Sequence, residues 1–352
     1  MNHLVLRNIH KKFNQVTALD DVNIEVPKGE LIALLGPSGS GKSTLLRILA
    51  GLDQPSQGEI LIDGKNILHV PTEKRNIGLV FQSYSLFPHM TVEKNIMFGL
   101  QARGLEKDDI HRIVSEILET IQLEGMASRF PHQLSGGQTQ RIAIARTLVT
   151  NPDVLLLDEP LASLDTKLRN EMRQFILRLH RKTKITTVLV THDQVEAMEM
   201  ADRIAVLHQG KLIQVDAPQK VFNCPQDEFV ASFMGAENIL TGNMQHQGNR
   251  WWLQCEIGSV PVHNIHDHAE GKLVKATVRP ERITLAQKKS GEGDIFEFEC
   301  RVNNWVYSGS TQTTEIQAGQ KTLSVMSLSG QMRDNPQTMT AVIRAEDIWI
   351  FP

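Results

Sequence analysis

The sequence contains few cysteines and no long apolar run. Its three cysteines, Cys224, Cys255 and Cys300, are widely separated and form no Cys-x-x-Cys pair. We therefore expect neither a disulfide framework nor a cysteine zinc site. A reducing, cytosolic setting fits this pattern. The longest apolar stretches, such as Leu31–Leu35 and Val154–Leu157, are far shorter than the ~20 residues of a membrane-spanning helix. If the protein acts at a membrane, another polypeptide must form the path through the bilayer.

The sequence also lacks a strong excess of charge of either sign. Lys and Arg number 37 against 40 Asp and Glu, which gives a formal net charge of -3, and 41% of the residues are hydrophobic. This balance is typical of a soluble globular protein and does not favour bulk binding to nucleic acid or anionic lipid. Met1–His10 carries Arg7 and polar residues where a signal peptide needs an apolar core, so we expect no targeting segment.

Length and sequence texture predict two domains, because 352 residues are many for one domain. Residues 1–235 alternate short apolar runs with helical periodicity, which is typical of an α/β domain with a largely parallel sheet. Residues 236–352 contain short alternating runs separated by polar turns, which indicate a small all-β barrel or sandwich. We therefore place the boundary near residue 235.

Several segments of the first predicted domain have a clear secondary-structure signal. The apolar runs Leu31–Leu35, Val154–Leu157 and Thr187–Val190 predict strands buried on both faces. Ligand-binding residues in such folds gather at the carboxyl ends of the strands. Apolar residues from Ile110 to Ile121 follow the i, i+3, i+4, i+7 spacing, which predicts an amphipathic helix that ends near Gly125.

A glycine-rich segment follows the first of these runs. It matches the phosphate-loop pattern G-x-x-x-x-G-K-[ST] and precedes the helical run Leu45–Leu49. In such a loop backbone N–H groups surround phosphate oxygens, Lys42 reaches the β and γ phosphates, and the Ser43 hydroxyl binds Mg²⁺. A flexible Gly/Ser turn is the alternative, which the strand-to-helix setting disfavours. The residues predicted to bind ATP here are Gly36, Pro37, Ser38, Gly39, Ser40, Gly41, Lys42, Ser43 and Thr44.

Two adjacent carboxylates, Asp158 and Glu159, follow the predicted strand Val154–Leu157. We expect Asp158 to hold Mg²⁺ through its water shell and Glu159 to accept a proton from the attacking water. An acidic pair after a strand is commonly a solvated turn or a helix cap. The phosphate loop upstream favours the catalytic interpretation.

A third motif, Leu134-Ser135-Gly136-Gly137-Gln138, precedes the acidic pair. Taken singly, Ser-Gly-Gly is more often a linker, but the apolar run Ile142–Ala145 that follows indicates a helix. With the three motifs in this order, the chain resembles the ATP-binding cassette (ABC) ATPases, α/β P-loop proteins with a helical subdomain, over residues 1 to about 235.

The resemblance implies that two copies of the chain form a homodimer. Ser135, Gly136, Gly137 and Gln138 would then bind the γ-phosphate of ATP held by the partner copy. A serine hydroxyl, a close glycine backbone and a helix N-terminus suit such an anion. Thr139 stands where close relatives often carry Gln, and we expect little effect because it lies past the glycines.

The same resemblance assigns roles to four further residues. Gln82 would contact Mg²⁺ or the lytic water, and His192 would bind the γ-phosphate and orient that water, although a lone Gln or His is commonly a surface or capping residue. Asp165 would lie at the dimer interface, but Ala162-Ser163-Leu164-Asp165 exchanges Ala and Ser relative to the usual pattern, which leaves open which hydroxyl faces the partner. Phe13 would stack on adenine, with core packing as the alternative.

The segment Ser83–Met90, directly after Gln82, is rich in aromatic and apolar residues although it is predicted to be a loop. An apolar loop beside the residue that senses hydrolysis is a candidate docking site for a helix of an integral membrane permease subunit. Packing inside the helical subdomain is the alternative.

Residues 236–352, with Val278–Ile283, resemble the oligonucleotide-binding-type (OB-like) regulatory domain of importer ATPases for sugars, polyamines, ferric iron, sulfate and similar solutes. We see no basic patch interleaved with stacking aromatics, so we expect no nucleic-acid partner. Trp251-Trp252 is predicted to form barrel core or a dimer contact rather than a ligand platform. Three histidines in a predicted loop are expected to be solvated rather than to bind metal: His263, His266 and His268.

Three hypotheses for the function remain. The first is the ATPase subunit of a bacterial solute importer at the cytoplasmic face of the inner membrane. Its homodimer would bind MgATP, close, drive the permease subunits and reopen after hydrolysis. A solute-binding protein would deliver the solute to the permease subunits. The second is the ATPase of an exporter, disfavoured only by the C-terminal domain. The third is a soluble ABC protein of translation or DNA repair, which would carry two cassettes or a long coiled coil. The transported solute is not readable from the chain.

Overall fold

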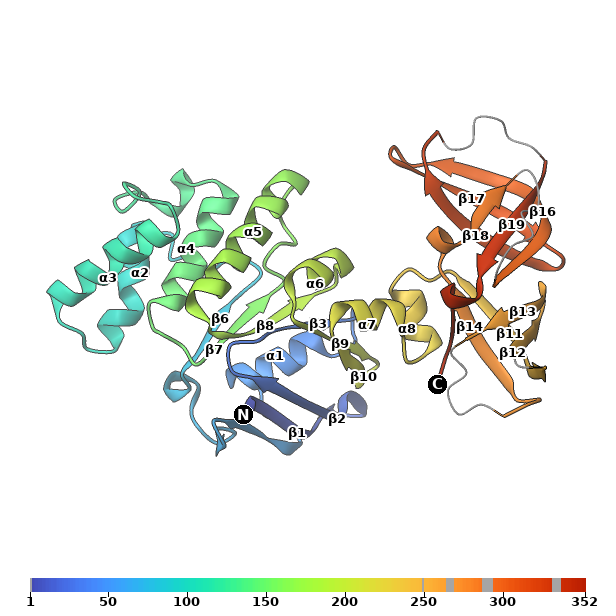
Figure 1. Cartoon of the computed structure of the whole chain (residues 1–352). Coiled ribbons are helices and arrows are strands. Elements are labelled where there is room, and N and C mark those ends of the chain that lie inside the picture. The colour runs from blue at the N-terminus through green and yellow to red at the C-terminus, as the bar shows by residue number, and fades with distance from the viewer. Residues whose placement is uncertain (1, 249, 264–268, 287–293, 331–336) are drawn as a thin grey trace. The chain divides into compact units, whose positions relative to one another are not determined.

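Residues 2–248, 250–263, 269–286, 294–330 and 337–352 are described by a computed structural model (Figure 1). Their contacts divide the chain into two units, Met1–Pro218 and Gln219–Pro352, and each unit is described here by itself. The sequence-based domain boundary near residue 235 stays a prediction.

The first unit is built on a six-stranded sheet in the order β10-β9-β3-β8-β7-β6. The strands from β9 to β6 run parallel, and β10 pairs antiparallel with β9. The predicted buried strands are confirmed as β3, β7 and β8, and their carboxyl ends share one edge of the sheet. The strands of this sheet are β3 (Leu31–Leu35), β6 (Ile77–Val80), β7 (Val154–Asp158), β8 (Thr186–Thr191), β9 (Arg203–His208) and β10 (Lys211–Asp216).

Side chains on the two faces of this sheet enter two separate cores. Leu155 and Leu157 of β7 pack with the helical side of the unit, whereas Val154 and Leu156 pack against helix α1 and a second, antiparallel sheet. The helices of the first side are α2 (Val92–Ala102), α3 (Lys107–Thr120), α4 (Gly136–Leu148), α5 (Thr166–Thr183) and α6 (Gln194–Met200), visible above the sheet in Figure 1. On the other side lie α1 (Lys42–Ala50), β1 (Asn2–Phe13), β2 (Val16–Pro27), β4 (Gln57–Ile62) and β5 (Lys65–Asn66).

Helix α3 confirms the predicted amphipathic helix but ends earlier than the expected stop near Gly125. Ile110, Val114 and Leu118 are buried on one face. The helix ends at Thr120 because Gln122 adopts a left-handed conformation, with φ of 59°, and the chain turns back there.

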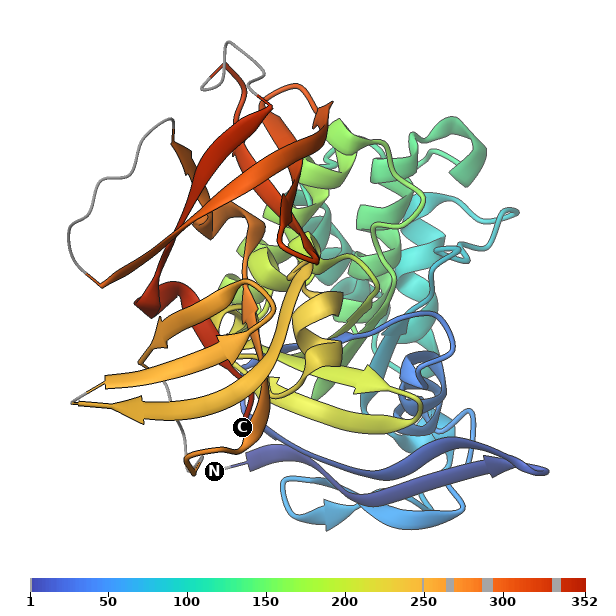
Figure 2. The same cartoon turned by 90° about the vertical axis from the view of Figure 1, so that its right-hand side faces the viewer.

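The second unit is all-β, as expected, apart from the short helices α7 (Pro218–Asn223) and α8 (Glu228–Phe233). Its strands, orange to red in Figure 2, form two five-stranded antiparallel sheets that share one apolar core, and Trp251 packs against that core. One sheet contains β11 (Asn238–Gln247), β12 (Arg250–Cys255), β13 (Gly258–Val262), β14 (Leu273–Val278) and β20 (Ile348–Ile350). The other contains β15 (Thr284–Ala286), β16 (Ile295–Tyr307), β17 (Thr311–Ala318), β18 (Lys321–Leu328) and β19 (Thr338–Arg344).

Cys224, Cys255 and Cys300 are not joined by disulfides, and Cys300 is buried. In the part of the chain that the structure describes, no helix combines the length and the apolar character needed to span a membrane.

A buried arginine, Arg279, ties the helical start of the second unit to its strands. Its guanidinium donates to the carbonyl of Met234 at 2.8 Å and to that of Phe222, and it lies 3.4 Å from the Phe222 ring centroid. Burial lowers the pKa of Arg279, which shows that its surroundings cost hydration. The two carbonyls and the ring offset this cost.

We expect Arg279→Met to destabilise the second unit by about 3 kcal/mol, because two buried carbonyls lose a charged donor. All four tryptophans, Trp251, Trp252, Trp305 and Trp349, lie in this unit, so tryptophan fluorescence during urea unfolding reports on it alone. The matched control is Arg282→Met, since Arg282 is exposed and pairs with the half-buried Asp347 at 3.3 Å. Equal midpoints for the two variants would contradict the assigned role of Arg279.

Candidate functional site

The loop between β3 and α1 has a backbone path that requires glycine. Gly41 forms the N-cap of α1 with φ of 107°. A Cβ atom at Gly36 would lie 2.2 Å from the carbonyl oxygen of Leu207, so any larger residue clashes with the backbone of β9. The loop therefore curls tightly before α1, which directs the first N–H groups of that helix outward, as an anion site requires.

Lys42 is buried within this loop. Its ammonium donates to the carbonyl of Gly36 at 2.7 Å and to that of Pro37 at 2.9 Å. Burial lowers the pKa of Lys42, and the nearby charges of Glu159 and Asp158 act in the opposite direction. The loop thus presents a cation beside two carboxylates, an arrangement that can bind a phosphate chain together with a metal ion.

The other side chains of the predicted ATP-binding loop differ in exposure. Ser38 and Ser43 are exposed, and Thr44 is half-buried. Ser40 is buried, and its hydroxyl lies in the wall of the loop, close to Gly36 and to the ammonium of Lys42. The Ser43 hydroxyl is therefore accessible to a metal ion, whereas Ser40 supports the loop from inside.

Three predicted catalytic residues, Gln82, Glu159 and His192, meet at the carboxyl edge of the sheet. Each follows a strand, β6, β7 and β8 respectively. The Glu159 carboxylate has one oxygen 3.3 Å from His192 Nδ1, and its other oxygen accepts from Gln82 Nε2 at 3.5 Å. Glu159 itself has φ of 43°, an unusual conformation for a side chain of this size, and its N–H donates to the carbonyl of Val190 at 3.0 Å. The chain thus aims this carboxylate between the other two residues.

Asp158, the preceding residue, lies deeper in the site. Burial raises its pKa, the charge of Glu159 raises it further, and Lys42 lowers it. Its carboxylate and the Ser43 hydroxyl are oxygen ligands of the kind that Mg²⁺ prefers together with phosphate and water. Within the described ranges no group of three or more His, Cys, Asp or Glu could hold a metal.

The segment Ser135–Gln138 forms the N-terminus of α4. The Ser135 hydroxyl accepts from Gln138 N–H at 3.3 Å, and the Gln138 side chain accepts from Ser135 N–H at 3.0 Å, which is a capping box. Helix α4 packs on the face of the sheet opposite to α1. Gly136 is exposed, whereas Gly137 is buried and a Cβ there would lie 2.7 Å from a methyl group of Leu168. Sequence analysis missed that Gly137 is needed for the packing of α4 against α5.

Asp165 and Phe13 have surroundings that bear on their expected roles. Asp165 is the N-cap of α5, where its carboxylate accepts from Leu168 N–H at 3.0 Å. The Ser163 hydroxyl, one of the candidates to face a partner, lies 3.0 Å from the hydroxyl of Tyr84. The Phe13 ring is 46% exposed and lies 4.7 Å from the ammonium of Lys11, which disfavours core packing and leaves a ring face for stacking.

The loop Ser83–Met90 is partly interior and partly surface. Tyr84 is buried, and the side-chain amide of Asn95 holds the backbone of Phe87. Phe81 is 42% exposed and Phe98 of α2 is 46% exposed, with the Phe98 ring 4.7 Å from that of Phe87. Interior packing therefore holds for one end of the loop, while exposed aromatic rings flank it, and the docking of a permease helix stays a prediction.

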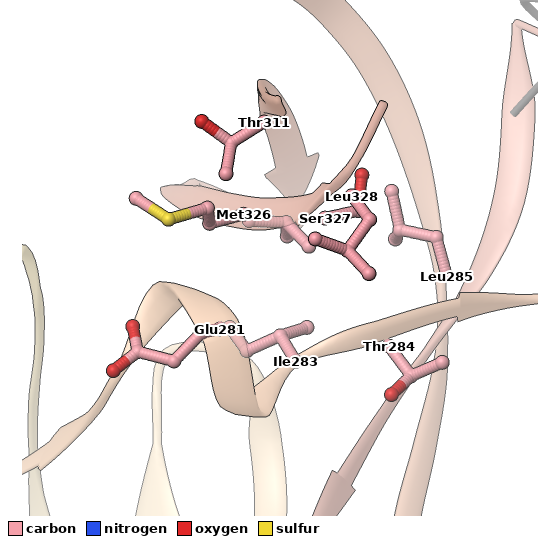
Figure 3. Close-up of a pocket in the computed structure, with 9 residues that line it drawn as sticks. Glu281, Ile283, Thr284, Leu285, Thr311, Met326, Ser327 and Leu328 are labelled. Atoms are coloured by element: carbon pink, nitrogen blue, oxygen red, sulfur yellow. The ribbon is translucent and has the colours of Figure 1, made fainter. Parts of the chain in front are cut away.

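The second unit contains a hollow of about 420 Å³ between β18 and the segment that leads into β15 (Figure 3). Glu281, Thr284 and Ser327 contribute polar atoms, and Leu285 and Met326 line it with apolar surface. Elsewhere in this unit His263 pairs with Asp294 at 3.4 Å. The two other histidines considered for metal binding, His266 and His268, lie outside the described residues.

Comparison with known proteins places this geometry in a family. A family model described as ABC transporter matches residues 19–162. The spermidine/putrescine import ATP-binding protein PotA 2 of Pseudomonas aeruginosa is 43% identical over 322 residues, which cover 90% of this chain and 89% of the relative. The sulfate/thiosulfate import ATP-binding protein CysA of Mycobacterium tuberculosis is 52% identical over 241 residues, or 68% of this chain and 69% of the relative.

Solved structures agree with these relatives. The dimeric structure of MJ0796, described as a bacterial ABC transporter cassette, has a TM-score of 0.55 at 33% identity and covers 61% of this chain and 98% of its own. CbiO1 from Clostridium perfringens, described as part of the ABC transporter complex cbiONQ, has a TM-score of 0.59 at 32% identity, with 63% and 91% covered.

We expect Asp158→Asn to abolish Mg²⁺-dependent ATP hydrolysis and yet to raise the melting temperature at pH 7 by a few degrees. The pKa of Asp158 is higher in the folded state than its ordinary value of 3.8, so the folded protein favours the neutral carboxyl. Its contribution to the free energy of unfolding is complete below pH 3.8 and is lost as the pH rises through the folded-state pKa. Asparagine keeps that stability at neutral pH, and the difference disappears in acid, where both states of the aspartate are protonated.

Melting curves of both proteins from pH 7 down to a pH below 3.8 measure this difference. The matched control is Asp153→Asn, an exposed carboxylate at the opposite end of the same strand, which should change the melting temperature little. A lower melting temperature for Asp158→Asn at pH 7 would show that the ionised Asp158 carboxylate does not destabilise the folded protein.

Proposed function

We propose that this chain, which belongs to the ABC transporter family, is the ATP-hydrolysing subunit of a membrane importer for a small solute and works as a homodimer. The chain is an ATPase whose hydrolysis is coupled to transport. The observation that carries the proposed mechanism is the meeting of Glu159, His192 and Gln82 beside the buried Lys42 loop.

ATP binding begins with the phosphate chain in the loop Gly36–Thr44. The N–H groups at the start of α1 and the Lys42 ammonium neutralise the phosphates, since Lys42 can exchange its loop carbonyls for phosphate oxygens. The exposed Phe13 ring stacks on the adenine. Ser43 and Asp158 would hold Mg²⁺, with Gln82 near it, and the bound ion would supply positive charge to the β and γ phosphates.

Hydrolysis requires a water placed in line with the γ-phosphate. Glu159 accepts a proton from that water, and its unusual backbone conformation aims the carboxylate at the place where the water must lie. His192, within 3.3 Å of Glu159, bonds to the γ-phosphate and orients the water. Gln82 links this centre to the loop Ser83–Met90 through its bond with Glu159.

The second copy supplies Ser135–Gln138. These residues cap an exposed helix N-terminus on the face of the sheet opposite to α1, which supports contact with the nucleotide of a partner rather than with that of the same chain. Asp165, exposed at the start of α5, would lie at the same interface. The dimeric cassettes among the solved relatives support this arrangement.

Import rather than export is supported by the relatives, which are named import ATP-binding proteins. Their named solutes, a polyamine in one case and sulfate or thiosulfate in the other, carry opposite charges although the ATPase chains are similar. The solute is therefore selected elsewhere, by permease and solute-binding subunits. Polyamine, ferric iron, sulfate, phosphonate and sugar importers remain the candidates.

The exposed rings of Phe81 and Phe98, beside the loop Ser83–Met90, form an apolar surface next to Gln82. A permease helix docked there would sense hydrolysis through Gln82. This arrangement puts the chain on the cytoplasmic face of the cell membrane, as a peripheral subunit. The all-β unit would act as a regulatory domain of the OB-like type.

We expect Glu159→Gln to bind ATP normally and to hydrolyse it at least about 100-fold more slowly, because the amide cannot accept the proton. The ATP-bound dimer then persists, and size-exclusion chromatography with and without MgATP measures it. Adding Lys42→Ala to the same chain should remove the dimer, because ATP no longer binds. Near-normal turnover of Glu159→Gln would remove Glu159 from the role of base.

The shared site predicts complementation between two inactive variants. Ser135→Arg damages the site on the partner's loop, and Lys42→Ala damages the site on its own loop. A mixed dimer of the two has one intact site, because both lesions fall in the other one. We expect each variant alone to be inactive and the mixture to release phosphate. If the site were formed within one chain, the mixture would stay as inactive as its components.

A further inference from the structure

One backbone carbonyl next to the catalytic carboxylate receives two side-chain donors from different elements. The carbonyl of Pro160, directly after Glu159, accepts from the Tyr84 hydroxyl at 3.0 Å and from Gln140 Nε2 at 2.5 Å. Tyr84 lies two residues after Gln82, and Gln140 lies two residues after Gln138 on α4. The residue after the base is thus bonded both to the loop of Gln82 and to the helix that carries Ser135–Gln138.

Gln140 is a costly residue at this position. Its side chain is fully buried, and its Oε1 atom has no hydrogen-bond partner among the described residues. A buried amide oxygen without a partner destabilises a fold, so an apolar residue of the same size would be more stable here. Packing alone does not account for a glutamine at the centre of this core.

Tyr84 completes the arrangement from the other side. Burial raises the pKa of its hydroxyl, which therefore stays protonated and able to donate. The same hydroxyl lies 3.0 Å from the Ser163 hydroxyl. The donor to Pro160 thus belongs to a small network that includes the segment leading to Asp165.

We propose that Gln140 and Tyr84 are positioning residues that hold Glu159 through the carbonyl of Pro160. In the proposed dimer, on which this inference rests, Ser135–Gln138 of each chain contact the nucleotide held by the partner. Gln140 then connects that contact, through α4 and Pro160, to the base of its own chain. A displacement of α4 would therefore displace Pro160 and, with it, the base of the same chain.

The first test is the steady-state ATPase activity of the full chain with Gln140→Met. Methionine conserves the volume and removes both the bond to Pro160 and the unpaired oxygen. Pro160 keeps its bond from Tyr84, so the melting temperature should be unchanged or higher. We expect kcat to fall about tenfold, because a small displacement of the base is sufficient for such a loss, with KM for MgATP within twofold of the wild type. Tyr84→Phe should have the same effect on kcat.

The control variant is Thr147→Val, which removes another buried polar group of the same helix. The Thr147 hydroxyl donates only to the carbonyl of Ala143 in its own helix, at 3.1 Å. We expect kcat of this variant to equal that of the wild type. A tenfold loss in the control as well would assign the effect to α4 in general and overturn the proposal.

A second measurement separates positioning of the base from contact with the nucleotide of the partner. In the Glu159→Gln background no base is present, and ATP-driven dimerisation depends on binding alone. We expect Gln140→Met to leave this dimerisation unchanged. If dimerisation weakens as much as kcat, Gln140 acts on the segment Ser135–Gln138 instead, and the proposal is wrong.

The double variant Tyr84→Phe with Gln140→Met tests the single carbonyl. Because both donors act through Pro160, the two losses in kcat should not multiply. A product of the two losses, or wild-type kcat in Gln140→Met, would overturn the proposal. Failure of the proposed function is distinguishable, since the Glu159→Gln chain would then form no ATP-dependent dimer at all.

Discussion

The site depends on a charged lysine that is kept inside the protein. Lys42 is buried and bonded to two carbonyls of its own loop, while Asp158 and Glu159 oppose the effect of burial on its pKa. Each of these charges would be unfavourable without the others. The parallel order of β3, β8 and β7 brings them together, because the loop follows β3 and the acidic pair follows β7. The fold therefore stabilises a cluster of charges whose natural complement is a metal-bound phosphate chain.

The helical side of the first unit has a different physical basis. Its segment Ser135–Gln138 contains no charge and offers only a helix N-terminus, a hydroxyl and backbone N–H groups. Such a surface binds an anion weakly on its own. In the proposed dimer it would meet an anion that the partner chain holds, and the divided site would close only with ATP bound. Gly137 lies against Leu168, which keeps this helix end close to the start of α5.

The sequence motifs predicted where these residues lie in the sheet, since charge and glycine patterns act over a few neighbouring residues, and their roles stay predictions. Lys42, Glu159, His192 and Gln82 lie where the strand ends were expected to bring them. The early end of α3 was not predictable, because Gln122 has no strong preference for a left-handed conformation. Nor was the bond from Gln140 to Pro160, which depends on the packing of two segments far apart in the chain. At Tyr84 the available signal was its residue type, because the hydroxyl of a buried tyrosine usually has a hydrogen-bond partner.

Of the eleven non-glycine residues with positive φ in the described part of the chain, three lie beside these long-range bonds. Glu159, Tyr84 and Ser85 have φ of 43°, 57° and 36°, although none is glycine. Residues in this region persist only where their surroundings determine them, and here the donors to Pro160 bind directly beside Glu159. The strained residues lie in the loop after β6 and at the end of β7, and the hydrogen bonds to Pro160 come from that loop and from helix α4. In the proposed dimer, a shift of α4 would therefore displace Pro160 and Glu159, and this connection would couple the nucleotide bound at one site to hydrolysis at the other.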